Sequence, residues 1–191
     1  YGSGGLKVGK MLAEELGIPV GIINSSQGGS PITSWMSEES LKKLGKEDYL
    51  KKLEFVKNPE NVKAKLATVN ESQSKWNELI NSNDVGLKER WESVPFNQLD
   101  EEWKVCSIPG NFDEIKTAGV MWFKKEFELS KDQAAAFNEK NAQIWMGTII
   151  DADKVWVNGS YCGETGYCYP PRRYPIEKGV LKEGKNTVTV R

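Results

Sequence analysis

The stretch "DKVWVNG" (residues 153–159) determines the architecture predicted for the second half of the chain. Within it, Val155, Trp156 and Val157 have the apolar and aromatic character of a short β-strand. The strand pattern ends at Asn158-Gly159, and both residues tolerate the positive φ of a two-residue hairpin turn. The sequence therefore predicts a strand, a tight turn and a returning strand at this point.

Other strand patterns surround this hairpin. They are "GVMWFKKEFEL" (119–129), "NAQIWMGTI" (141–149) and "NTVTVR" (186–191), the last with Val188 and Val190 on one face. Between the first two, "LSKDQAAAFNEKN" (129–141) is expected to be a surface connection with a helical turn. Several short strands separated by turns favour an all-β sandwich or jelly roll over residues 90–191.

The first 45 residues follow a different pattern. Residues 6–16 place apolar side chains on one helical surface, and Gly17 is a typical C-terminal stop. The run "IPVGII" (18–23) then predicts a short strand buried in a parallel sheet. This is one α/β step of a doubly wound fold, in which ligands collect in the loops beyond the carboxyl ends of the strands.

Residues 46–89 are expected to form a helical linker between these two parts. The charged segment 37–58 is predicted to be helical, with Ser37 as an N-cap. Residues 60–80 predict an amphipathic helix whose apolar side must pack against another part of the protein. The expected organisation is therefore 1–45, 46–89 and 90–191.

Composition excludes several classes of function. The 26 Lys and Arg residues balance 27 Asp and Glu residues without a basic block, so no nucleic-acid partner is expected. No apolar run approaches the ~18 residues of a membrane span. The chain has no histidine, which excludes a Ser-His-Asp mechanism within these residues alone. No cofactor and no metal are expected, since Asp151 and Asp153 fall short of a calcium ligand set.

The three cysteines leave two possibilities open. Cys162 and Cys168 are close enough in sequence to bridge a loop in an oxidising compartment. The odd count, with Cys106 left over, is equally compatible with free thiols.

The corner "NSSQGGS" (24–30) has two interpretations. It is either a plain turn that uses the steric freedom of glycine, or a loop whose backbone N–H groups stabilise an oxyanion. Ser25, Ser26 and Ser30 are rejected as nucleophiles, because the segment has no G-x-S-x-G elbow and the chain has no base to activate a hydroxyl.

Two long segments carry a family resemblance. "GKMLAEELGIPVGIINSSQGGSPITSWMS" (9–37) resembles part of the bacterial sialate O-acetylesterases, which belong to the SGNH-hydrolase superfamily. Residues 108–191, from "IPGNFDE" through "DADKVWVNG" and "PPRRY", are similar to a sugar-binding jelly roll inserted in those esterases. The resemblance implies a flavodoxin-like SGNH α/β fragment followed by a galactose-binding-like β-sandwich.

The resemblance also implies a role for the glycine corner. Gly28 takes the place of a backbone donor to the oxyanion hole, and Gly29 keeps the loop tight. Gln27 and Ser30 stand where the family has Trp and Thr, which changes the shape of the acyl pocket. The family's "GQSNM", "QGE" and Asp-x-x-His motifs are absent from these residues.

The expectation is therefore an internal fragment, inert alone, that works with the rest of a parent esterase. By resemblance, the parent is periplasmic or extracellular and removes acetyl groups from sialic acid or related glycans. The alternatives are a non-catalytic carbohydrate-binding module and a structural insert that shapes the approach of the substrate.

The β part contains candidate sugar contacts. Arg172 and Arg173 can bind a sugar carboxylate, or they can pair with Asp151 or Asp153 and fasten the domain. Tyr169 belongs to the same loop region and is a candidate substrate contact, together with Tyr161 and Tyr167. The tryptophans at strand positions, Trp122, Trp145 and Trp156, are expected in the core, with Trp103 covering an edge of the sandwich.

Overall fold

The computed structural model describes residues 3–23, 25, 27–110, 112–113 and 115–191. The chain divides into two compact units, Tyr1–Asn70 and Glu71–Arg191. This division lies inside a long helix, and the boundaries expected at residues 45 and 89 stay predictions. None of the helices in the described ranges combines the length and hydropathy needed to cross a bilayer.

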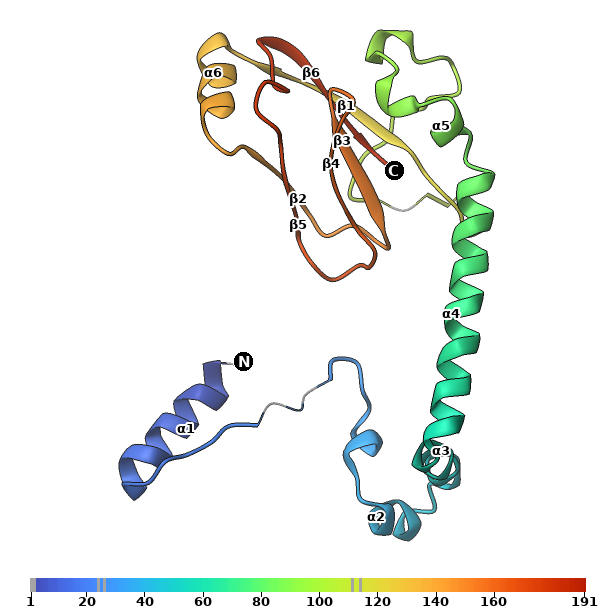
Figure 1. Ribbon diagram of the computed structural model, residues 1–191, viewed down its shortest axis with the longest axis vertical. Helices are drawn as coiled ribbons and strands as arrows, with labels where there is room; N and C mark the ends of the chain where they lie inside the picture. The colour runs from blue at the N-terminus through green and yellow to red at the C-terminus, as the bar shows by residue number, and fades with distance from the viewer. Residues whose placement is uncertain (1–2, 24, 26, 111, 114) are drawn as a thin grey trace. The chain divides into compact units, whose positions relative to one another are not determined.

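Helices are the regular secondary structure among the described residues of the first unit (Figure 1). Helix α1 ends immediately before Gly17, whose φ of 63° confirms the predicted stop. Ser37 caps α2 as expected, because its hydroxyl accepts the Ser40 N–H at 3.2 Å. The helices are α1 (Ser3–Leu16), η1 (Ile32–Trp35), α2 (Glu38–Lys43), α3 (Glu47–Lys57) and α4 (Pro59–Ser82), which continues into the second unit.

The first unit buries little apolar surface. Leu41 is the one apolar side chain that is buried among its described residues. Residues 18–23 form no strand, and Ile18 and Ile23 are 55% and 93% exposed. The expected buried parallel strand is therefore wrong for this structure. A strand needs neighbouring strands to pair its N–H and C=O groups, and no described residue of this unit is in one.

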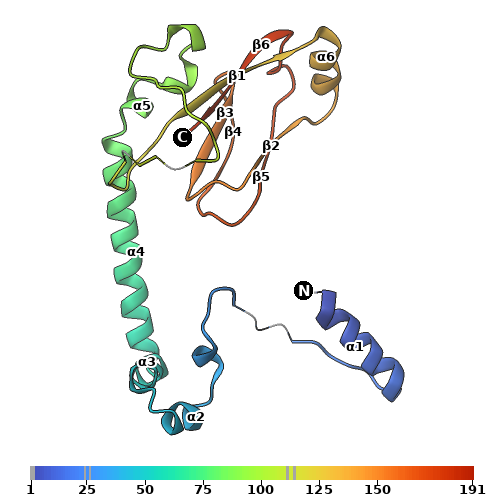
Figure 2. The ribbon, with the colours of Figure 1, turned by 180° about the vertical axis from the view of Figure 1, so that it is seen from behind.

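The second unit contains two antiparallel sheets (Figure 2). One has the strand order β1-β6-β3-β4, and the other pairs β2 with β5. Asn158 and Gly159 have φ values of 49° and 80° and join β3 to β4, which confirms the predicted hairpin. The strands are β1 (Phe123–Leu129), β2 (Gln143–Gly147), β3 (Asp153–Val157), β4 (Ser160–Thr165), β5 (Arg172–Pro175) and β6 (Gly184–Val190).

One apolar core is shared by the two sheets. Val155 and Val157 of β3 are fully buried and pair with Val190 and Val188 of β6. Tyr174 of the other sheet belongs to the same cluster of buried side chains. The second unit is therefore an antiparallel β-sandwich, as the strand patterns predicted, because each strand turns alternate side chains toward this core.

Short helices join the strands. Helix α6 (Lys131–Glu139) forms a full helix where a single turn was expected, because Ser130 and Gln133 close a reciprocal capping box at its first turn. Before β1, the chain forms α5 (Val85–Lys88), η2 (Trp91–Ser93) and η3 (Phe96–Gln98).

The segment before β1 is fastened to the sandwich by a buried carboxylate. Asp84 caps α5 by accepting the Leu87 N–H. It also accepts the Trp122 indole N–H at 2.9 Å and pairs with Arg191 at 2.5 Å. Burial raises the pKa of Asp84, but the hydrogen bonds from Arg191 and Trp122 outweigh it and hold the pKa below its usual value.

Candidate functional site

The glycine corner forms a tight turn. The Ser30 N–H donates to the Gln27 carbonyl at 3.3 Å, and Gly29 at the third position has a φ of 77°. Positive φ at this position is the signature of a type II turn. Ser30 Oγ donates to the same Gln27 carbonyl at 2.6 Å and accepts the Trp35 indole N–H at 2.8 Å. Hydrogen bonds of Ser30, the last residue of the turn, therefore hold the turn in shape.

The amides of Gly28 and Gly29 stay available in this turn. No described residue accepts a hydrogen bond from either amide. A Cβ built on either glycine meets no atom within 4 Å, so the surroundings of both are open. Asn24 and Ser26, part of the same corner in the sequence, lie outside the described residues. The oxyanion role of Gly28 and the supporting role of Gly29 stay predictions.

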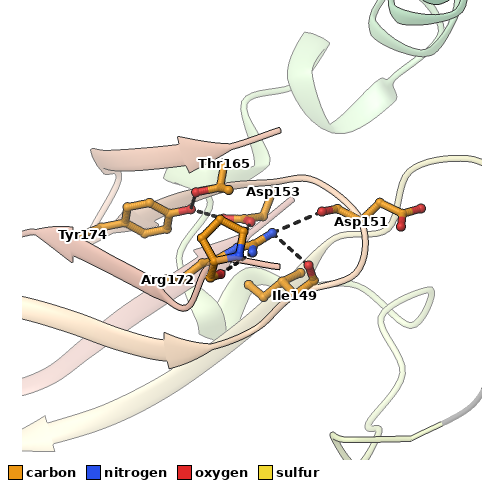
Figure 3. A network of polar contacts seen from close by, with 7 residues as sticks. Ile149, Asp151, Asp153, Thr165, Arg172 and Tyr174 are labelled. Atoms are coloured by element: carbon orange, nitrogen blue, oxygen red, sulfur yellow. Dashed lines mark hydrogen bonds and ion pairs between the residues drawn. The ribbon is translucent and has the colours of Figure 1, made fainter. Parts of the chain in front are cut away.

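Arg172 lies at the centre of a buried polar network (Figure 3). Its Nε donates to Asp153 Oδ1 at 2.5 Å, and the side chains of both residues are fully buried. Nη1 donates to the Pro170 carbonyl at 2.6 Å, while Nη2 donates to the carbonyls of Ile149 and Asp151 at 2.8 and 3.1 Å. Of the two roles left open for Arg172, the structure shows the ion pair, and the buried guanidinium is closed to a dissolved sugar.

Asp153 is satisfied from its other side by Tyr174. The Tyr174 hydroxyl donates to Asp153 Oδ2 at 2.6 Å and lies 2.7 Å from the Thr165 hydroxyl (Figure 3). Burial, followed by the bond to Asp153, raises the pKa of Tyr174 to about 12. The Tyr174 ring packs over Gly163, where a Cβ would lie 2.5 Å from it. This network stabilises the sandwich and offers no open site.

Arg173 points to the opposite face of the same strand and is exposed. It pairs across the sheet with Trp145, and its guanidinium carbon lies 4.4 Å from the centroid of the Trp145 ring. Trp145 is 68% exposed, so the expectation that it is in the core is wrong. Ile144 and Met146, its neighbours on β2, take the inward positions. Arg173 and Trp145 therefore form an exposed cation–π pair.

Tyr169 is 81% exposed and lies edge-on to Tyr167, with ring centroids 6.4 Å apart. Both tyrosines belong to the loop between β4 and β5. No interaction with Arg173 links them to the Trp145 pair among the described residues. Tyr169 as a substrate contact stays a prediction.

The other strand tryptophans pack inward. Trp156 is buried and Trp122 half-buried, and their rings stack with centroids 5.5 Å apart. Trp122 continues edge-on to Trp91 at 5.9 Å, and Trp91 contacts Trp103 at 5.2 Å. The core expectation is confirmed for Trp156. Trp103 lies half-buried at the end of this row.

Sequence reasoning missed a hollow at the end of the tryptophan row. The hollow has a volume of about 220 Å³. Its apolar walls come from Trp91, Trp103, Val94 and Leu99, and its polar groups come from Glu89, Gln98 and Asp100. These side chains lie within 15 residues in the sequence, but the irregular segment shows no strand or helix periodicity to signal a site.

Among the described residues, the cysteines and acidic side chains form no further centre. Cys106, Cys162 and Cys168 are free thiols, and burial raises the pKa of Cys162. Within the described ranges, no group of three or more Cys, Asp or Glu side chains is arranged to hold a metal ion.

Comparison with known proteins yields partial structural similarity. No family model matches the chain, and no curated protein matches its sequence. A beta-glucuronidase from an uncultured Clostridium sp. is similar over 56% of this chain and 18% of its own, with 18% identity and a TM-score of 0.43.

The Ruminococcus gnavus b-glucuronidase in complex with uronic deoxynojirimycin has the same coverage and TM-score, with 24% identity. Another crystal structure of the Ruminococcus gnavus enzyme covers 36% of this chain at 26% identity, with a TM-score of 0.31. The chain spans at most 18% of the length of these glucuronidases.

Proposed function

We propose that this chain is the accessory part of a carbohydrate O-acetylesterase resembling the sialate O-acetylesterases. In this proposal, a Ser-His-Asp set on polypeptide outside these residues attacks the acetyl carbonyl of an acetylated sialic acid or a related glycan. The Gly28 N–H donates a hydrogen bond to the oxyanion as it forms. The jelly-roll connectivity of the β-sandwich and a periplasmic or extracellular location belong to the same proposal.

The Gln27–Ser30 turn is the observation that carries this proposal. Its shape is set by the Ser30 hydrogen bonds, while no described residue uses the amides of Gly28 and Gly29. Backbone donors held in place before the reaction need no reorganisation when negative charge develops. The absence of histidine from the sequence supports an accessory role, because no imidazole base is available in these residues.

A direct test starts with the isolated chain, which should not hydrolyse p-nitrophenyl acetate above the buffer rate. Turnover comparable to a working esterase would refute the accessory role. The decisive variants are then made in the parent esterase. Gly28→Pro removes the N–H but suits the second position of a type II turn, so kcat should fall about 10²–10³-fold.

Gly28→Ala is the matched control for that loss. It keeps the N–H, its Cβ meets no atom within 4 Å, and Gly28 does not have a left-handed φ. Activity should therefore stay within about twofold of the wild type. Equal losses in Gly28→Pro and Gly28→Ala would show that the hydrogen-bond donor is not what the esterase uses.

A second candidate function is glycan binding by the β-sandwich. The exposed Trp145 ring with Arg173 over it favours this function, because an apolar ring face and a guanidinium together suit a sugar that carries a carboxylate. Titration with a sialoside and with the matching neutral galactoside would test it. Arg173→Gln should abolish the preference for the acidic sugar, whereas Lys178→Gln, a change of another exposed cation, should not.

A further inference from the structure

The hollow between Trp91 and Trp103 has the size of a site for a small ligand. Its volume of about 220 Å³ lies below the range of about 300–1,000 Å³ for drug-sized ligands. The hollow therefore suits a ligand of one ring. Its residues all belong to the second unit, within the segment fastened to the sandwich through Asp84.

Other aromatic side chains support the aromatic walls of the hollow. The Trp91 and Trp103 ring planes are inclined at 59°, so the two indoles form a corner rather than a closed stack. Trp91 rests edge-on against Trp122, which stacks on the buried Trp156. The Trp91 indole N–H is also held by the Glu89 carboxylate at 3.0 Å. The wall is thus preorganised, which lowers the entropic cost of binding.

The polar groups of the hollow are mostly acceptors. Glu89 and Asp100 each accept one N–H in the structure, from Trp91 and from the Glu102 backbone. A carboxylate has about four acceptor sites, so both keep free ones, and the Gln98 amide adds donors and an acceptor. None of the described residues that line the hollow is a Lys or Arg. This set suits a ligand that donates several hydroxyl groups and repels an anionic sugar.

A neutral ligand fits better than an organic cation. Aromatic rings and carboxylates also attract quaternary ammonium groups. Here, however, the Lys124 ammonium already donates to the backbone carbonyls of Trp91 and Val94, two of the residues that line the hollow. This positive charge offsets part of the attraction that Glu89 and Asp100 exert on a cation, whereas a neutral polyol binds through its hydroxyl groups and is unaffected by it.

We propose that the hollow formed by Glu89, Trp91, Gln98, Asp100 and Trp103 binds the ring of a neutral pyranose. The apolar face of the sugar packs in the indole corner, and its hydroxyl groups donate to the two carboxylates. This site goes beyond the proposed function and depends neither on the Gly28 turn nor on the Trp145–Arg173 pair.

The test uses the full 191-residue chain with ¹⁵N-labelled indoles, observed by NMR. The probes are methyl β-glucopyranoside and methyl β-galactopyranoside, with choline and sodium glucuronate in parallel. At least one neutral pyranoside should shift the Trp91 and Trp103 indole signals with a Kd of about 1–10 mM. The Trp145 signal should stay in place. Saturation by choline alone, or no saturation by either pyranoside, would overturn the proposal.

Trp103→Ala supplies the variant test, because Trp103 lies at the free end of the tryptophan row. The affinity for the pyranoside, measured from the Trp91 indole signal, should fall about tenfold. The matched control Trp145→Ala removes an exposed indole elsewhere and should leave the Kd unchanged. If Trp103→Ala unfolds, the isosteric Asp100→Asn should still weaken pyranoside binding severalfold. An unchanged Kd in whichever of these two hollow variants folds would contradict the proposal.

Discussion

At the scale of single residues, the neighbours Arg172 and Arg173 have opposite surroundings. Arg172 is 1% exposed and its donors are bound by protein acceptors, whereas Arg173 lies in solvent over Trp145. A buried charge left without its partner costs far more than a surface charge that loses its own. The two arginines should therefore respond very differently to mutation.

Arg172→Ala should lower the free energy of unfolding by about 3–5 kcal/mol, because it leaves the Asp153 carboxylate buried and unpaired. Urea denaturation followed by circular dichroism would measure this loss. The control is Lys185→Ala, which breaks the surface pair with Glu126 at 3.1 Å and should cost about 0–1 kcal/mol. Equal losses in the two variants would show that the Asp153 pair is not as buried as the structure has it.

The Tyr174 hydroxyl gives the same network a dependence on pH. Because its pKa is raised in the folded protein to about 12, Tyr174 stabilises the fold fully below its unfolded pKa of about 10. This contribution is lost as pH rises from about 10 to 12, and it amounts to about 3 kcal/mol at about 1.4 kcal/mol per unit.

Absorbance titration of the tyrosine phenolates would check that stability falls as Tyr174 ionises. The wild type should show a late ionisation near pH 12 that coincides with alkaline unfolding. Tyr174→Phe should lose that late step and flatten the decline in stability above pH 10, although it is less stable at neutral pH. A late step that persists in Tyr174→Phe would assign it to another tyrosine.

At the scale of elements, the β3–β4 hairpin depends on its two turn residues. Asn158 accepts the Thr187 N–H at 2.8 Å through its side chain and donates to Asn186 and to the Val180 carbonyl, also at 2.8 Å. The turn thus fastens β6 and the preceding loop as well as joining β3 to β4. Gly159 contributes backbone freedom rather than contacts.

Gly159→Ala should lower the free energy of unfolding by about 1–2 kcal/mol, because an L-residue is strained at its φ of 80°. Thermal unfolding is the measurement. Its matched control is Gly166→Ala, a glycine outside the left-handed region with open space around its Cβ position. That change should be neutral or slightly stabilising, and a comparable loss there would mean that loss of glycine, not φ, sets the cost.

At the scale of the whole molecule, the two units differ in how much they bury. Most of the buried apolar side chains belong to the second unit, whereas helix α1 leaves Leu6 and Leu16 65% and 58% exposed. A 14-residue helix with so little packing is marginal in water. Local stability follows buried contacts, so the units should open independently.

Hydrogen exchange read by mass spectrometry should show this contrast in the intact 191-residue chain. Amides of β3 and β6 should be protected to the level of global unfolding, while those of α1 and residues 18–23 should exchange orders of magnitude faster. Peptides from the part of α4 that belongs to the second unit, beyond residue 70, serve as an internal reference. Protection of α1 equal to that of β3 would mean that α1 has tertiary contacts that this structure lacks.

Local signals in the sequence determined a good part of this fold. The stop at Gly17, the cap at Ser37 and the Asn158-Gly159 hairpin depend on the backbone preferences of a few adjacent residues, and each was predicted correctly. Most strands of the sandwich, though not β5, were predicted because alternation and turns are also local properties. The oxyanion role of Gly28 rests on resemblance and stays a prediction.

The tertiary structure alone decided which candidate side chains face the core. Trp145 faces outward and Arg172 inward because their strands orient Ile144 and Tyr174 toward the shared core. The run at 18–23 has the composition of a strand, yet it forms none without a neighbour to pair with it. The hollow at Trp91 exists because an irregular segment folds against Trp122 and Lys124, which lie about 30 residues further along the chain. These outcomes depend on partners distant in sequence, which residue patterns alone do not identify.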